Sequence, residues 1–336
     1  MADRLRRLVH ELWEEDDPRP AARILGLALA PAELAFRAAV AARSGWHDRR
    51  QRPGPSIPVV SVGNLTVGGT GKTPILHWIG DWFRGRGVQV AVAVRGYGRD
   101  EVALYRRWFG GEAVFMGVDR CAGVRAAGEK GYRVALVDDG FQHRRLGRTL
   151  DILVVAAEDP LRVRMLPRGR YREPIRAAAR ATHVLLTRRT AGRGAVEAWR
   201  ERLARLAPGV PVLQVEMTMG DWRDLAGNPA KAPGRDVLAV CSIARPRAFA
   251  AGLRRLLPAA HIELAAYPDH HEYTAGDVRA LLARRKGRAI VCTDKDAVKL
   301  IRHRELAGHA VAVGLRAGGE PRGTLLTALE DVARRL

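Results

Sequence analysis

The sequence predicts an α/β protein, with a P-loop-type, mostly parallel sheet flanked by helices and a second, smaller α/β domain. From Ser56 onward, short β-branched runs alternate with helical stretches, which is the pattern of a parallel sheet with crossover helices. A polar stretch at 220–235, which contains glycine and proline, then interrupts the pattern as a linker would. Beyond it, a second and shorter series of strand and helix signals follows.

We therefore expect three parts: an N-terminal helical segment at 1–55 with possible membrane contact, a P-loop nucleotide-binding domain at 56–218, and a smaller α/β domain at 219–336 that closes the cleft. In the first domain, strands are expected at 58–62, 88–94, 134–137, 150–155, 184–186 and 212–215. In the second, strands are expected at 237–240, 262–264, 289–291 and 310–313, and helices at 246–256, 275–284 and 324–335.

In the N-terminal segment, the apolar stretch at 24–41 is interrupted by Pro31, Glu33 and Arg37, so it falls short of the ~20 apolar residues of a spanning helix. Its apolar side chains precede Trp46 and a basic cluster at 49–52. This combination favours a pair of short helices that lie in a membrane interface. The alternative is a helical segment that packs on its own domain.

The composition is that of a globular protein with anionic partners. The 336 residues, 47% of them hydrophobic, suffice for two cores. The net charge of +21 comes mostly from arginine along the whole chain. It favours nucleic acid, phosphorylated substrates or an acidic membrane surface, although a biased genome would produce the same excess. The three cysteines, Cys121, Cys241 and Cys292, have no paired or metal-like spacing, which fits a reducing, cytoplasmic compartment.

A glycine-rich turn lies between the first strand and an amphipathic helix, where a phosphate loop belongs. It reads Gly68-Gly69-Thr70-Gly71-Lys72-Thr73-Pro74. Its glycines allow backbone N–H groups to converge on phosphate oxygens, while Lys72 can reach the β- and γ-phosphates and Thr73 can offer its hydroxyl to Mg²⁺. Thr66 stands where the consensus begins with glycine. We predict that residues 68–73 bind a nucleotide.

Two adjacent carboxylates, Asp138 and Asp139, follow the buried strand at 134–137. This is the form of a Walker B element, in which carboxylate oxygens hold a hard cation. Asp138 is the predicted Mg²⁺ ligand, and Asp139 would support the metal or the nucleophile. Together with the phosphate loop, the pair predicts Mg²⁺-dependent nucleotide chemistry without identifying an acceptor.

Several motifs in the same order resemble the tetraacyldisaccharide 4'-kinase family of lipid A biosynthesis. The resemblance covers roughly residues 56–300. Its motifs are Val62-Gly63-Asn64 before the phosphate loop, Arg95-Gly96-Tyr97, Asp138-Asp139-Gly140-Phe141-Gln142-His143, Leu166-Pro167, Arg172-Glu173-Pro174, Ile243-Ala244-Arg245-Pro246, Asp269-His270 and Thr293-Asp294-Lys295-Asp296-Ala297-Val298-Lys299.

The resemblance implies phosphate transfer from ATP, with Mg²⁺, to the 4'-hydroxyl of a tetraacylated glucosamine disaccharide 1-phosphate. The implied partners are this lipid-linked disaccharide and an anionic membrane surface, which the chain would bind peripherally at the cytoplasmic face of the inner membrane. No nucleic acid is expected, because no aromatic-interleaved basic platform is present. The alternative is a P-loop switch protein that hydrolyses a nucleotide at the membrane.

The resemblance also implies site roles. It gives Asp100 as the catalytic base and His270 as its orienting or proton-sharing partner. Asp139 is the alternative base, because the segment before Asp100 is shorter here than in the family. The resemblance places Arg172 and Glu173 in the phosphate and metal region, with Glu173 as a metal ligand. The remaining expected substrate or phosphate contacts are Arg95, Gln142 and His143.

Other residues admit a structural interpretation. Tyr97 would pack under its loop, and Lys295 with Asp296 would form the start of a helix. His270 and His271 have no third ligand at a spacing typical of zinc.

Overall fold

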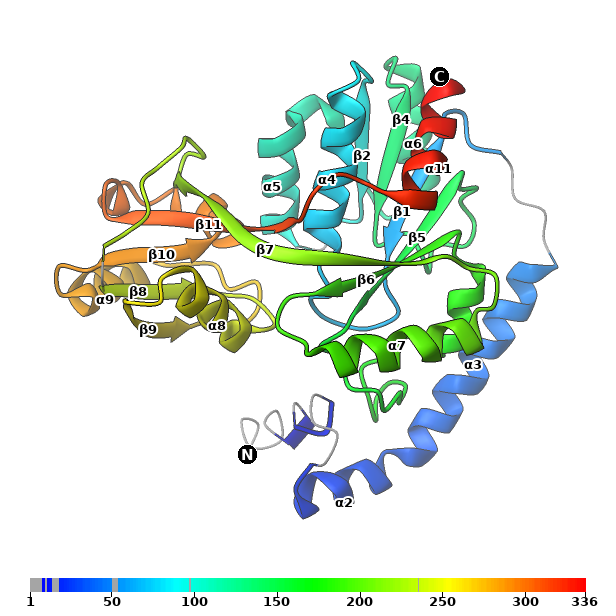
Figure 1. The fold of residues 1–336 in the computed structure, drawn as a ribbon, viewed down its shortest axis with the longest axis horizontal. Helices are drawn as coiled ribbons and strands as arrows, with labels where there is room; N and C mark the ends of the chain where they lie inside the picture. Colours follow the sequence, from blue (N-terminus) through cyan, green and yellow to red (C-terminus); the bar gives the residue numbers. More distant parts are fainter. Residues whose placement is uncertain (1–7, 10, 14–17, 50–53, 97, 235) are drawn as a thin grey trace.

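A computed structural model of the chain describes residues 8–9, 11–13, 18–49, 54–96, 98–234 and 236–336 (Figure 1). The strands are β1 (Val59–Gly63), β2 (Val90–Val94), β3 (Val114–Met116), β4 (Val134–Asp138), β5 (Leu150–Ala156), β6 (His183–Arg188), β7 (Val212–Asp224), β8 (Asp236–Cys241), β9 (His261–Ala266), β10 (Ala289–Thr293) and β11 (Ala310–Ala317). The α-helices are α2 (Pro20–Ala28), α3 (Ala30–Asp48), α4 (Lys72–Arg84), α5 (Arg99–Phe109), α6 (Arg120–Glu129), α7 (Arg193–Leu206), α8 (Pro246–Leu256), α9 (Ala275–Arg285), α10 (Asp294–Leu300) and α11 (Gly323–Arg334). Short 3₁₀ helices lie at Gly111–Ala113, Ile175–Arg180 and Arg304–Leu306.

The eleven strands of the described residues form one continuous sheet in the order β3-β2-β4-β1-β5-β6-β7-β11-β10-β8-β9. The strands from β3 to β7 pair in parallel, and so do those from β11 to β9. Only the junction between β7 and β11 is antiparallel. The predicted mostly parallel sheet is therefore confirmed, and every strand predicted from the sequence is present. Strand β3 and the helices α5, α6 and α7 are not among the elements that the sequence predicts.

Strand β7 crosses from one half of the molecule to the other (Figure 1). Residues 212–216 pair with β6, whereas residues 217–224 pair with β11. The predicted linker at 220–235 is therefore wrong at its start, because 220–224 are part of this strand; the structure does not describe residue 235. Gly220 and Asp221 are breakers by local propensity, and Asp221 forms a bulge with a φ of +56°, but pairing with β11 continues on both sides of it. The predicted boundary between 218 and 219 falls inside β7.

Helices cover both faces of the larger half of the sheet. Helices α4, α5 and α11 pack on one face, and α6 and α7 contribute to the cores of the other. Helix α11 buries Leu325, Leu329 and Val332 in the same core as Val60 of β1. The predicted range of 219–336 for the smaller domain is thus wrong at its C-terminal end, because after β11 the chain returns to the first half.

Helices α2 and α3 lie along the outside of the larger half (Figure 1). Glu33 of α3 is buried and accepts a hydrogen bond of 2.9 Å from the backbone N–H of Met165, and Phe36 and Val40 pack against the core beneath. The helices are therefore partly packed on their own domain, as the alternative interpretation expected. Of the basic cluster at 49–52, only Arg49 lies within the described residues.

The outward face of these helices is apolar. Ile24, Leu27 and Leu34 are 68%, 67% and 69% exposed. Among the described residues, no single helix has the length and apolar character needed to cross a bilayer, whereas the pair Pro20–Ala28 and Ala30–His47, bent by 49°, meets both criteria together.

Candidate active site

A cavity of about 840 Å³ opens between the two halves of the molecule. The phosphate loop forms one wall, and residues from the smaller half, including His270 and Lys295, form the other. Predicted site residues that line it are Gly68, Gly69, Thr70, Gly71, Lys72, Thr73, Arg95, Asp138, Asp139, Arg172 and His270. Its size suits a nucleotide-sized ligand. Tyr97 lies outside the described residues.

The phosphate loop connects β1 to α4 as the sequence predicts. Gly68 and Gly71 have φ values of +105° and +96°, which residues with a Cβ rarely adopt. The start of α4 at Lys72 directs its free backbone N–H groups and the positive end of its dipole toward the cavity. Lys72 Nζ donates to Asn64 Oδ1 at 3.1 Å and lies 3.6 Å from Asp139 Oδ1. The loop is therefore shaped for an anion.

Asp138 ends β4 directly beside β1, where its partner in the sheet is Val62. Burial, reinforced by the charge of Glu101, raises the pKa of the Asp138 carboxyl to about 7. Its Oδ1 is buried and accepts no hydrogen bond from any residue that the structure describes. A buried carboxylate oxygen with no partner, in a cavity that Thr73 also lines, fits a hard divalent cation. Mg²⁺ thus suits the residues present.

Asp139 follows with φ of +52°, and an ion pair holds its side chain. Arg172 Nη1 and Nη2 donate to its two oxygens at 2.6 and 2.7 Å, and Arg172 Nη2 also donates to Asn64 Oδ1 at 2.5 Å. Burial raises the pKa of Asp139, but the charge of Lys72 and the Arg172 hydrogen bonds outweigh it, so the pKa lies below its usual range. Asp139 thereby ties Arg172 and Lys72 to the loop.

Asp100 and His270 come together across the two halves although 170 residues separate them. Asp100 lies at the start of α5 with its side chain 2% exposed, and His270, at 44%, faces the cavity. His270 Nδ1 lies 2.9 and 3.0 Å from the two carboxylate oxygens. This hydrogen bond raises the pKa of His270. Burial raises the pKa of Asp100, but the bond from His270 and the charge of Lys295 bring it below its usual value.

The adjacent residue of α5 makes a second bond across the cleft. Lys295 of α10 donates to Glu101 Oε1 at 2.5 Å, and both residues line the cavity. The helix start predicted for Lys295 and Asp296 is present, because Thr293 caps α10 by accepting from Asp296 N. Lys295 thus holds α10 against α5 rather than serving only as part of a helix start.

Four predicted site residues do not line the cavity: Asp100, which is connected to it through His270, and Glu173, Gln142 and His143. Glu173 accepts a hydrogen bond of 2.8 Å from Arg180 and does not line the cavity, and its role as a metal ligand stays a prediction. Gln142 donates to the backbone oxygen of Asn64 at 2.9 Å, so it supports the loop from behind. His143 also lies outside the cavity lining.

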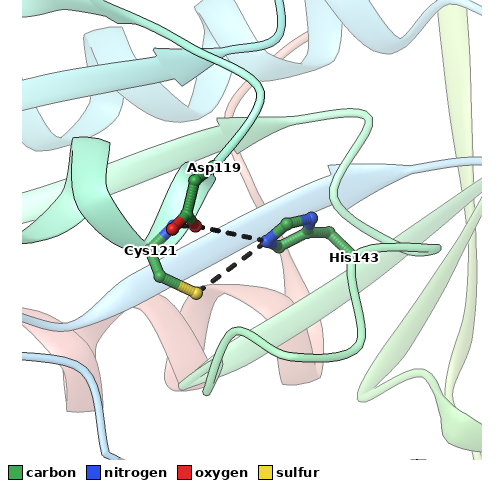
Figure 2. A group of neighbouring side chains, drawn as sticks. All are labelled: Asp119, Cys121 and His143. Atoms are coloured by element: carbon green, nitrogen blue, oxygen red, sulfur yellow. Dashed lines mark hydrogen bonds and ion pairs between the residues drawn. The ribbon is translucent and has the colours of Figure 1, made fainter.

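His143 instead meets Asp119 and Cys121, as Figure 2 shows. Its Nε2 is 3.8 Å from the Cys121 sulfur and 4.0 Å from Asp119 Oδ1. Spacing along the chain did not indicate a metal site at Cys121, because folding brings His143 close from 22 residues away. Asp119 is already explained as the N-cap of α6, since it accepts from Cys121 N at 2.9 Å.

Five arginines for which the sequence predicts no role also line the cavity: Arg120, Arg189, Arg245, Arg255 and Arg316. Arg120, at the start of α6, is buried and close enough to Asp138 and Asp139 to interact with both charges. Arg189 donates to the backbone oxygen of Gly69 at 2.9 Å. Arg245 forms an ion pair with Asp159 across the two halves. Only Arg245 had a signal in the sequence, since it belongs to one of the family motifs.

Comparison with known proteins then decides the family. The family model described as tetraacyldisaccharide-1-P 4'-kinase matches residues 25–332. The chain belongs to this family. A tetraacyldisaccharide 4'-kinase of Anaeromyxobacter sp. (strain K) is 39% identical over 327 residues, with 86% of this chain and 85% of that protein covered. The protein of the same name from Koribacter versatilis is 35% identical, with 85% and 93% covered.

A solved structure supports the fold. The crystal structure of LpxK from Aquifex aeolicus, described as an "apo" form in complex with ATP, matches with a TM-score of 0.71 at 23% identity. The match covers 92% of this chain and 99% of that one. Membership of the tetraacyldisaccharide-1-P 4'-kinase family confirms the predicted resemblance and the prediction of a lipid A 4'-kinase over a nucleotide-hydrolysing switch. The predicted cofactors, ATP and Mg²⁺, follow from membership of this kinase family.

Proposed function

We propose that the chain transfers the γ-phosphate of ATP to the 4'-hydroxyl of a tetraacyldisaccharide 1-phosphate, using the Asp100–His270 pair for proton transfer. The observation that carries this proposal is the cavity between the halves, in which the phosphate loop faces His270. A cavity with an anion cradle on one wall and a proton acceptor on the other fits phosphoryl transfer to a hydroxyl.

The donor side is built from the loop and the end of β4. Backbone N–H groups of residues 68–72 and the Lys72 ammonium would hold the β- and γ-phosphates. Thr73 and Asp138 would hold Mg²⁺, which neutralises charge on the phosphates when bound. Arg120 and Arg172, both lining the cavity beside Asp139, add positive charge where the transferred group becomes more negative.

In the reaction, the acceptor oxygen attacks the γ-phosphorus, the bond from that phosphorus to the bridging oxygen breaks, and ADP leaves. The hydroxyl proton would pass to the Asp100–His270 pair through His270, the member that lines the cavity, and Asp100, hydrogen-bonded to His270 Nδ1, would be the carboxylate base that shares it. We prefer Asp100 to Asp139 because its partner His270 can accept and release a proton, whereas Arg172, which occupies both oxygens of Asp139, stays protonated.

We further propose that the chain binds its lipid acceptor while lying on an anionic membrane surface, at the cytoplasmic face of the inner membrane. The exposed Ile24, Leu27 and Leu34 would enter the interface, and the net charge of +21 would attract acidic headgroups. This peripheral placement would give the cavity access to a hydroxyl on a lipid headgroup.

An acceptor-dependent assay tests the proposed function. With radiolabelled ATP, the wild type should place one phosphate on the disaccharide lipid, and omitting the lipid should abolish ATP consumption. Hydrolysis of ATP at an equal rate without the lipid would contradict the proposal and favour the switch protein. A lipid whose 4'-hydroxyl is replaced by hydrogen is the matched control and should give no labelled product.

A further inference from the structure

A buried lysine lies behind the Asp100–His270 pair. Lys299 of α10 has a side chain that is only 3% exposed, and its Nζ is 3.7 Å from Asp100 Oδ2. The same ammonium lies 3.2 Å from Asp296 Oδ1 and donates to the Ser242 hydroxyl. The ammonium is therefore hydrogen-bonded to Ser242 and forms ion pairs with two carboxylates, Asp100 and Asp296. Lys299 does not line the cavity, so it cannot contact the nucleotide there.

Asp296 fixes this ammonium in place. Its carboxylate, fully buried, accepts hydrogen bonds from Ser242 N at 3.1 Å, Ser242 Oγ at 2.5 Å, Tyr273 Oη at 2.9 Å and Thr293 Oγ1 at 2.6 Å. A carboxylate with so many donors around it cannot turn without breaking several hydrogen bonds at once. Asp296 therefore holds Lys299 at one position, facing Asp100.

The same cluster also supports the other member of the pair. The backbone oxygen of Ser242 accepts from His270 N at 3.2 Å. His270 has a φ of +59°, which is uncommon for a residue with a Cβ and persists only where its surroundings impose it. Ser242 therefore connects His270 to Lys299. Its backbone carbonyl accepts from His270 N, and its hydroxyl accepts from Lys299 Nζ.

We propose that Lys299 is a positioning residue for phosphoryl transfer: it supplies the buried positive charge that keeps Asp100 ionised and directed at His270 Nδ1. Only the expected effect on kinase activity rests on the proposed function. The expected effect on the titration of His270 concerns the protein without ligands. Because a positive charge within about 4–6 Å favours the deprotonated form of its neighbours, removing it raises the proton affinity of the pair.

Other charged groups face the pair and stay in place when Lys299 is changed. Asp269 Oδ2 lies 3.9 Å from His270 Nε2, so it favours protonation of the ring. Lys295 acts on Asp100 in the same sense as Lys299, from one helical turn earlier on α10. Two carboxylates lie further from the pair. The charges of Glu101 and Asp138 act on Lys295, and the charge of Glu101 also acts on Asp269.

The test compares Lys299→Met with the wild type. We expect the midpoint of the His270 titration, followed by NMR of ¹³C-labelled histidine, to move up by about one pH unit. The acidic limb of kcat/KM against pH should move in the same direction, while the KM for ATP stays within about twofold. Lys299→Arg keeps the charge and should restore the wild-type midpoint. Lys130→Met, at an exposed lysine paired with Glu112, is the control and should move neither quantity.

A merely structural role predicts a different result. If kcat fell by the same factor at every pH while the His270 midpoint stayed at its wild-type value, the proposal would be overturned. Should Lys299→Met not fold, Lys299→Gln removes the charge and keeps a donor for Ser242. The midpoint of the His270 titration in that variant then tests the proposal in the same way. The titration needs no turnover. A shifted midpoint in a chain without kinase activity would therefore refute the proposed function and leave the role of Lys299 intact.

Discussion

The two walls of the cavity are built in different ways. On the nucleotide wall, the phosphate loop and Asp138 extend from β1 and β4, neighbours in one parallel sheet. On the opposite wall, Asp100 and His270 meet only because the smaller half docks against α5, with α10 supplying Lys295 and Lys299. Nucleotide binding is therefore a property of one sheet. Proton transfer depends on contacts between the two halves. The effect of a substitution on ATP binding should therefore be separable from the effect of a substitution on proton transfer.

The largest effect is expected from Asp100→Ala. Loss of the base should lower kcat by about 10²–10⁴-fold, because a positioned proton acceptor contributes in that range. The dissociation constant for ATP, measured by calorimetry, should stay within about twofold because Asp100 does not line the cavity. Near-normal turnover for Asp100→Ala together with a large loss for Asp139→Ala would show that the base lies on the nucleotide wall.

Lys72→Ala tests the opposite wall. Removing a charged donor aimed at the transferred phosphate should cost about 10²–10³-fold in kcat and should also weaken ATP binding. Lys72→Arg is the matched control, since it keeps the charge but not the compact ammonium geometry, and it should recover part of the loss. The comparison between the walls fails if Lys72→Ala binds ATP as tightly as the wild type.

Asp138→Asn should abolish activity yet stabilise the protein free of ligands. The folded carboxyl has a pKa of about 7, above the ordinary aspartate value of 3.8, so the folded state binds the extra proton between about pH 4 and 7. Stability is therefore lost as pH rises through that window, by up to about 4 kcal/mol. Thermal unfolding at pH 8 should show a higher Tm for Asp138→Asn than for the wild type. At pH 4 the difference should be small, and an equal difference at both pH values would show that burial of the charged carboxylate is not its cause.

The smallest effect concerns the membrane. Leu27→Asp should weaken binding to vesicles that contain acidic lipid by about tenfold in a sedimentation assay, because a charge replaces an apolar side chain in the interface. Val118→Asp changes a residue of similar exposure, 73%, at a turn remote in sequence from α2 and α3, and should change binding by less than about twofold. Equal losses for the two variants would remove α2 from the proposed membrane surface.

The same contrast explains what the sequence could and could not predict. Short motifs after β-branched strands predict the place of residues 68–73 and Asp138 at the carboxyl edge of the sheet. No such motif predicts that Asp100 and His270 lie together. Their pairing was expected only from family resemblance, and the structure brings the two side chains together.

The failures have physical causes of the same kind. The polar stretch that begins at Gly220 predicts a linker, but pairing with β11 on both sides of the bulge at Asp221 extends β7 to Asp224. Glu173 follows Arg172 in a motif and accepts a hydrogen bond from Arg180, and its role as a metal ligand stays a prediction. The C-terminal helix was assigned to the nearer domain, whereas its apolar face fits the core beside β1. The extension of β7 and the packing of α11 both depend on contacts between residues far apart in the chain.

The location of the triphosphate tests the account most directly. A crystal structure with a nonhydrolysable ATP analogue and Mg²⁺ should show the β- and γ-phosphates within hydrogen-bonding distance of the backbone N–H groups of residues 68–72. The γ-phosphate should face His270 across the cavity. A structure in which that loop is empty and the nucleotide lies elsewhere would contradict the account.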